Sequence, residues 1–77
     1  MYDGEMMYDE EMIKFWLDEL KSTGQSIPEA IEEAKADISN QRLWQKGADT
    51  QEQVEMYEAN IATLVEYINR LESMVVT

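Results

Sequence analysis

The C-terminal third of the chain carries an apolar pattern that an α-helix can use and a β-strand cannot. Seven apolar residues recur there at alternating intervals of three and four positions: Val54, Tyr57, Ile61, Leu64, Ile68, Leu71 and Val75. This spacing places all of them on one side of a helix, whereas a strand would distribute them over both faces. The pattern therefore predicts a continuous helix over residues 50–76, with an apolar seam of the a/d heptad type.

A second helix is predicted over residues 27–46. Ser26 and Glu29 have the spacing of a capping box, Pro28 is tolerated in a first turn, and Gly47 supplies a C-terminal stop. The apolar stripe of this segment is narrow and contains Ile27, Ala30, Ile31, Ala34 and Ile38. The alanines allow a neighbouring helix to come close. Two glutamines occupy the positions where the stripe would continue, Gln41 and Gln45.

A third, shorter helix is predicted over residues 9–22, with Asp9 as its N-cap and Gly24 after its end. Its apolar face consists of Ile13, Trp16, Leu17 and Leu20, extended sideways by Tyr8, Met12 and Phe15. This arc covers roughly half of the helix circumference, which is wider than the ~100° stripe of an ordinary surface helix. We therefore expect more than one neighbour to pack on this helix.

These elements predict an all-α fold within a single small domain over residues 1–77. Both connections are short, so consecutive helices should run antiparallel. The expected arrangement is a three-helix bundle, made of a long antiparallel two-helix hairpin (27–46 and 50–76) and the shorter N-terminal helix packed against it. A chain of this size buries little more apolar surface than folding requires. We therefore expect a homodimer or a higher homo-oligomer.

The N-terminus consists of two near-copies of a six-residue segment, MYDGEM and MYDEEM. A period of six does not match the helical period of 3.6, so the tyrosines of the two copies do not share one helix face. Gly4 makes the first copy a poor helix former, and we predict that residues 1–7 are a frayed acidic tail. In the alternative interpretation, Tyr2, Met6, Met7 and Tyr8 belong to an acidic-aromatic segment that becomes ordered on a basic, apolar partner.

The charge balance points to a protein partner with a basic surface. The chain has 17 acidic and 6 basic residues and no histidine, for a net charge of −11. Such a surface repels nucleic acid and anionic lipid but attracts basic protein surfaces. The sequence has no cysteine, no long apolar run and no basic N-terminus of the signal-peptide kind. We therefore expect a cytoplasmic protein that contacts neither nucleic acid nor membrane directly.

Part of this negative charge forms a regular series on the C-terminal helix. Asp49, Glu52, Glu55 and Glu58 recur every three residues without an intervening base, opposite the apolar seam, and Glu66 rejoins the series two turns later. Successive carboxylates rise about 4.5 Å, compared with roughly 3.4 Å between phosphates on one DNA strand. This acidic ribbon is either a functional imitation of a nucleic acid strand or a solvated helix face that keeps the protein soluble.

One pair of motifs suggests enzymatic chemistry. Glu29-x-x-Glu32 and Glu52-x-x-Glu55 resemble the paired carboxylate motifs of the all-α nucleoside triphosphate pyrophosphohydrolases, and the resemblance implies a Mg²⁺-dependent enzyme. That family ends its second motif in aspartate, where this chain has Glu55. The apolar seam also turns Glu52 and Glu55 away from the core, and histidine and cysteine are absent. We therefore expect no catalytic residues, no bound metal and no cofactor.

Three functional hypotheses follow, in decreasing order of support. The first is a non-catalytic acidic helical protein, most specifically an inhibitor encoded by a phage or mobile element that covers the nucleic-acid-binding surface of a host or defence protein in the host cytoplasm. The second is a homo-oligomeric structural or assembly protein, and the third is the pyrophosphohydrolase-like enzyme. The expected partner-binding residues are the ribbon carboxylates and three apolar side chains: Asp49, Glu52, Glu55, Glu58, Glu66, Leu43, Trp44 and Phe15.

Overall fold

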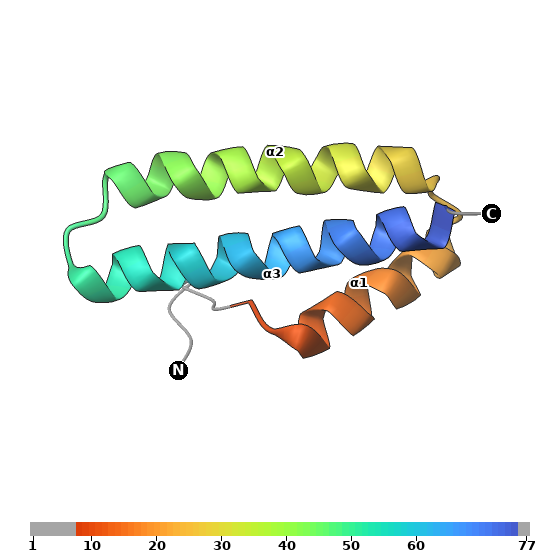
Figure 1. Cartoon of the computed structure of the whole chain (residues 1–77), viewed down its shortest axis with the longest axis horizontal. Coiled ribbons are helices and arrows are strands. Elements are labelled where there is room, and N and C mark those ends of the chain that lie inside the picture. Colours follow the sequence, from red (N-terminus) through yellow and green to blue (C-terminus); the bar gives the residue numbers. More distant parts are fainter. Residues whose placement is uncertain (1–7, 76–77) are drawn as a thin grey trace.

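The computed structural model describes residues 8–75, and this part of the chain is all-helical (Figure 1). It contains helices α1 (Glu10–Thr23), α2 (Ile27–Lys46) and α3 (Gln51–Val75). The predicted all-α class is confirmed, and each helix begins and ends within one residue of its predicted boundary. The predicted tail at residues 1–7 lies outside the described residues. Of the alternative acidic-aromatic segment only Tyr8 is described, and it is half-buried against the chain's own helices.

The first two helices begin at the predicted capping residues. The Asp9 carboxylate accepts a hydrogen bond from the Met12 N–H at 3.1 Å. The Ser26 hydroxyl accepts one from the Glu29 N–H at 3.3 Å. These side chains satisfy backbone donors that have no partner within the first turn of a helix, and so they fix where α1 and α2 start.

Helix α3 begins with a reciprocal pair of hydrogen bonds. The Thr50 hydroxyl accepts from the Gln53 N–H at 3.1 Å, while the Gln53 side-chain oxygen accepts from the Asp49 N–H at 2.9 Å.

Helix α1 ends at Gly24. This glycine has a φ of +73°, and its N–H donates to the Leu20 carbonyl at 3.0 Å. A left-handed conformation of this kind favours glycine, because a Cβ atom would be strained there.

Helices α2 and α3 lie side by side along most of their length, and α1 packs mainly against α3 (Figure 1). The contacts between α2 and α3 fit the predicted hairpin. The buried core takes residues from all three helices: Ile13, Leu20, Ala30, Ala34, Leu64, Tyr67, Ile68 and Leu71. The two core residues of α2, Ala30 and Ala34, are both small, which allows a neighbouring helix to pack closely.

The buried surface of α3 differs from the predicted seam at three positions. Leu64, Ile68 and Leu71 are buried as expected, but Val75 at the end of the seam is 50% exposed. Conversely, Asn60 and Tyr67 lie outside the seam and are buried. Helix α3 has neighbours on two sides, α1 and α2, so its buried arc is wider than an a/d seam made for one partner.

Candidate functional site

The acidic ribbon starts at the connection between α2 and α3. Asp49 precedes α3, and Glu52, Glu55 and Glu58 lie in its first turns, all with exposed side chains. Among residues 8–75, none of these four carboxylates forms an ion pair. Glu55 accepts a hydrogen bond from the Gln51 side-chain amide at 3.3 Å. This end of the molecule therefore carries four carboxylates that form no ion pair in the described chain, with Lys46 as the basic residue of the last turn of α2 there.

Glu66 differs from the other carboxylates of the ribbon because it is paired with Arg70. The Arg70 Nε lies 3.1 Å from the Glu66 carboxylate, and its Nη2 lies 2.7 Å from that of Glu10. Hydrogen bonds to Glu10 and then to Glu66 raise the pKa of Arg70 above its ordinary value. Arg70 thus links the start of α1 to the last third of α3, and the charge of Glu66 is locally compensated.

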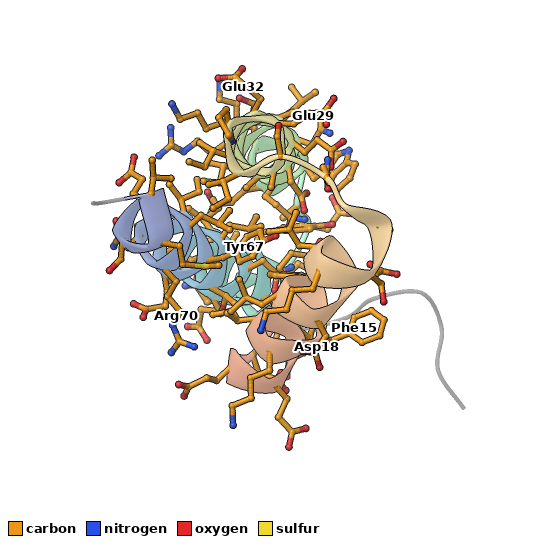
Figure 2. All side chains as sticks on the ribbon, turned by 90° about the vertical axis from the view of Figure 1, so that its right-hand side faces the viewer. Phe15, Asp18, Glu29, Glu32, Tyr67 and Arg70 are labelled. Carbon is orange, nitrogen blue, oxygen red and sulfur yellow. The ribbon has the colours of Figure 1, made fainter. Side chains whose placement is uncertain are left out.

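Two of the three predicted apolar anchors lie at the same end of the molecule as the unpaired carboxylates. Leu43 and Trp44 are in the last turn of α2, where they are 63% and 50% exposed. The Trp44 ring lies 6.4 Å from that of Tyr57 on α3. Phe15 is also exposed but lies on α1, and it points outward there in Figure 2. The structure therefore places Leu43 and Trp44 at the same end of the molecule as the ribbon, with Trp44 on the seam side of α3, and leaves Phe15 on α1.

A buried pair of amide side chains, Gln41 and Asn60, lies between α2 and α3; only Gln41 stands out in the sequence, as an interruption of the α2 apolar stripe. The Asn60 side-chain N–H donates to the Gln41 side-chain oxygen Oε1 at 3.1 Å. The Asn60 side-chain oxygen Oδ1 in turn accepts a hydrogen bond from the backbone N–H of Tyr8 at 2.7 Å. Because buried polar groups are costly unless they are hydrogen-bonded, this arrangement fixes where Tyr8 can lie.

Tyr8 connects the segment before α1 to both long helices. Its hydroxyl donates to the Asp37 carboxylate at 3.2 Å and accepts from the Gln41 amide at 3.2 Å. Its backbone carbonyl accepts a hydrogen bond from the Thr63 hydroxyl at 3.3 Å. We refer to Tyr8, Asp37, Gln41, Asn60 and Thr63 as the polar network. The only sequence signal for it is the position of Gln41 on the line of the α2 apolar stripe.

A central groove runs between α1 and α2, with α3 as its floor. Its volume is about 570 Å³, and its charged lining residues are Glu19 from α1 and Glu33 and Asp37 from α2. None of the six lysines and arginines of the chain lines it. No sequence motif marks this groove, because the carboxylates that line it lie on different helices.

Aromatic rings line the groove from the start of α1 to its floor. The ring centroids of Tyr8 and Trp16 are 5.3 Å apart with planes at 83°, and those of Trp16 and Tyr67 are 5.1 Å apart at 57°. Tyr67 lies on the inside, between the three helices (Figure 2). Burial raises the pKa of the Tyr67 hydroxyl, and the negative charges of Glu33 and Glu19 raise it further. The groove therefore has a negative electrostatic potential at its floor.

Within residues 8–75, no three acidic side chains come together as a metal site, so Glu29 and Glu32 do not converge there with Glu52 and Glu55. None of the three described helices is both long enough and apolar enough to cross a membrane. Comparison of the chain with protein-family models, with curated proteins and with solved structures finds no match.

Proposed function

We propose that this protein is a non-catalytic, acidic helical protein that binds a basic surface on another protein. The observation that carries the proposal is the composition of the α2–α3 end. Four exposed carboxylates without ion-pair partners among the described residues lie at the same end of the molecule as the exposed side chains of Leu43 and Trp44. Excess charge of one sign next to an exposed aromatic residue is a typical composition for a charge-steered protein interface.

In the proposed mechanism, the two groups of residues have different roles. The carboxylates of Asp49, Glu52, Glu55 and Glu58 accelerate association by long-range attraction, which depends strongly on ionic strength. Trp44 and Leu43 provide the apolar contact that slows dissociation. The most specific form of this function is that of an inhibitor from a phage or mobile element. It would act in the host cytoplasm, and its carboxylates would occupy the groove in which a host or defence protein binds nucleic acid.

Capture of binding proteins tests the proposal. The immobilised chain is incubated with a bacterial lysate, bound proteins are eluted with increasing salt, and each is purified and tested for competition with duplex DNA. The proposal predicts a basic nucleic-acid-binding protein that elutes at moderate salt and is displaced by DNA. Capture of proteins without a basic surface, or binding that neither salt nor DNA weakens, would contradict it.

Exposed apolar side chains favour a second candidate function, a homo-oligomeric assembly protein. Large apolar side chains are exposed on all three helices: Phe15, Leu43, Trp44, Val65, Met74 and Val75. In this alternative the acidic residues serve only for solubility. Sedimentation of the wild type and of Leu43→Ala/Trp44→Ala distinguishes the two functions. An assembly protein sediments as an oligomer that the substitutions dissociate, whereas the charge reversal Glu55→Lys/Glu58→Lys leaves its oligomer intact.

A further inference from the structure

The central groove combines uncompensated negative charge with a defined cavity. Glu19 and Glu33 line it from opposite walls, and neither carboxylate forms an ion pair or a hydrogen bond with another residue in the 8–75 range. Asp37 also lines the groove, but it already accepts hydrogen bonds from Tyr8 and Gln41. The two glutamates therefore remain available to a cation that enters from outside the chain.

Tyr67 provides an independent indication that the groove has a ligand. Its side chain is only 8% exposed, it lines the floor of the groove, and its hydroxyl has no hydrogen-bond partner within residues 8–75. No fully buried side-chain oxygen or nitrogen in residues 8–75 lacks a hydrogen bond, so the unpartnered Tyr67 hydroxyl opens to the groove, where only solvent or a ligand can supply its hydrogen bonds. A ligand with an N–H donor could supply one of them, because the Tyr67 oxygen can accept while its O–H donates elsewhere.

The remaining lining residues match the apolar part of such a ligand. Trp16 stands between the rings of Tyr8 and Tyr67, and Leu20 and Leu64 line the same cavity. An indole ring attracts cations through its π face. The volume of about 570 Å³ lies within the range of small-molecule sites, roughly 300–1,000 Å³.

We propose that the central groove is a binding site for a small organic cation, namely a protonated aliphatic amine. Its ammonium group is held by Glu19, Glu33 and the Tyr67 hydroxyl, and its hydrocarbon body lies against Trp16 and Leu20. No carboxylate of the acidic ribbon lines this groove, although Trp44, the anchor of the proposed interface, lines its other end. The amine site itself uses Glu19, Glu33, Tyr67, Trp16 and Leu20, none of which belongs to the proposed interface. The inference therefore does not rest on the proposed function.

The test is a titration followed by the NMR signal of the Trp16 indole N–H in the full chain. The probes are hexylammonium chloride and its neutral analogue 1-hexanol, which share the hydrocarbon body and differ in the charged group. The proposal predicts a saturable shift with hexylammonium and binding of 1-hexanol that is at least about tenfold weaker, as expected when charge-assisted hydrogen bonds are lost. No saturable shift with hexylammonium, or equal binding of the two probes, would overturn it.

Matched variants separate the site from the general negative charge of the protein. Glu19→Gln/Glu33→Gln and Glu52→Gln/Glu55→Gln each remove two carboxylates from exposed positions, which changes the net charge from −11 to −9. The first pair should weaken hexylammonium binding by about tenfold or more, and the second by less than about twofold. Equal losses for the two pairs would overturn the proposal, since binding would then reflect net charge alone.

Two further arms complete the test. Tyr67→Phe retains the ring and removes the hydroxyl, so hexylammonium should bind severalfold more weakly while circular dichroism stays that of the wild type. Unchanged affinity in this variant would contradict the role given to Tyr67. Binding of a trilysine peptide without binding of hexylammonium would also overturn the proposal, because it would assign the groove to a segment of a protein partner.

Discussion

The side chain of Asn60 on α3 donates a hydrogen bond to that of Gln41 on α2 at 3.1 Å, and the two residues are only 2% and 3% exposed. Removing one member of this pair leaves the other buried without its partner, which typically costs about 1–3 kcal/mol. We therefore predict that Asn60→Leu and Gln41→Leu each lower the free energy of unfolding by this amount, as measured by urea denaturation.

The double variant Gln41→Leu/Asn60→Leu provides the control for this prediction. With both amides removed, neither amide is left buried without the other, so the loss should be smaller than the sum of the two single losses. The bonds from Tyr8 to Asn60 and from Gln41 to Tyr8 are lost in the single and double variants alike and do not enter this difference. Additive losses would show that the two side chains contribute independently, and the hydrogen bond would then not account for their burial.

Tyr8 is predicted to hold the start of α1 on the other two helices. Tyr8→Phe retains the ring that packs on Trp16 but removes hydrogen bonds to Asp37 and Gln41. We expect a loss of about 1 kcal/mol and faster hydrogen exchange of the α1 amides, with little change in α2 and α3. Tyr57→Phe is the matched control, because the Tyr57 hydroxyl makes no hydrogen bond in the described part of the chain. Equal effects of the two substitutions would contradict the role of the polar network.

The two helix-terminal glycines should respond differently to alanine. Gly24 has a φ of +73°, so Gly24→Ala should destabilise the protein by about 1 kcal/mol through backbone strain alone, since a Cβ there meets no atom within 4 Å. Gly47 has a φ of −95°, and a Cβ there would lie at an ordinary 3.8 Å from the Trp44 carbonyl oxygen. Gly47→Ala should therefore leave stability unchanged or raise it by up to about 1 kcal/mol. Thermal denaturation of both variants measures the difference.

The raised pKa of Tyr67 predicts a specific response to alkaline pH. Burial and the charges of Glu33 and Glu19 disfavour the tyrosinate form in the folded state, whereas the unfolded chain ionises near pH 10. The contribution of Tyr67 to the free energy of unfolding is fully present below pH 10. It is lost as the pH rises through the folded-state pKa, because over this range the unfolded state binds fewer protons than the folded state. In Tyr67→Phe the alkaline decline of stability should be shallower.

Ultraviolet titration of tyrosinate absorption gives a direct test of the electrostatic part of this effect. Glu19→Gln/Glu33→Gln should lower the pKa of the most basic tyrosine toward the ordinary value, whereas Glu52→Gln/Glu55→Gln should leave it nearly unchanged. If neither pair alters the titration curve, the two glutamates do not set the potential at the floor of the groove.

The helices and their ends could be predicted because their signals are local. Asp9, Ser26 and Thr50 supply caps within one turn of the residues they serve, and Gly24 allows the left-handed turn that ends α1. The carboxylates of the ribbon could likewise be placed on the exposed face, because their position follows from the period of the apolar seam. Short-range hydrogen bonds and helical periodicity therefore account for most of the agreement.

The polar network and the central groove could not be predicted, because they depend on contacts between distant parts of the chain. Tyr8 and Asn60 are 52 positions apart, and Gln41 looks like an interruption of an apolar stripe until Asn60 is placed opposite it. The i,i+4 spacing of Glu66 and Arg70 is visible in the sequence, but the second partner of Arg70, Glu10, is not. The groove depends on the angle between α1 and α2, which helical periodicity does not encode.

The most direct test of the proposed function is the affinity of a charge-reversed variant for the captured partner. Glu55→Lys/Glu58→Lys reverses two charges of the ribbon, and Asp18→Lys/Glu72→Lys reverses two exposed charges elsewhere on α1 and α3. The dissociation constants are measured for both variants and the wild type over a range of salt concentrations. We predict that the ribbon reversal weakens binding by at least about tenfold at low salt and flattens the salt dependence, while the control reversal changes affinity by less than about threefold. Equal losses in the two variants, or wild-type binding that does not weaken with salt, would contradict a specific role of the ribbon.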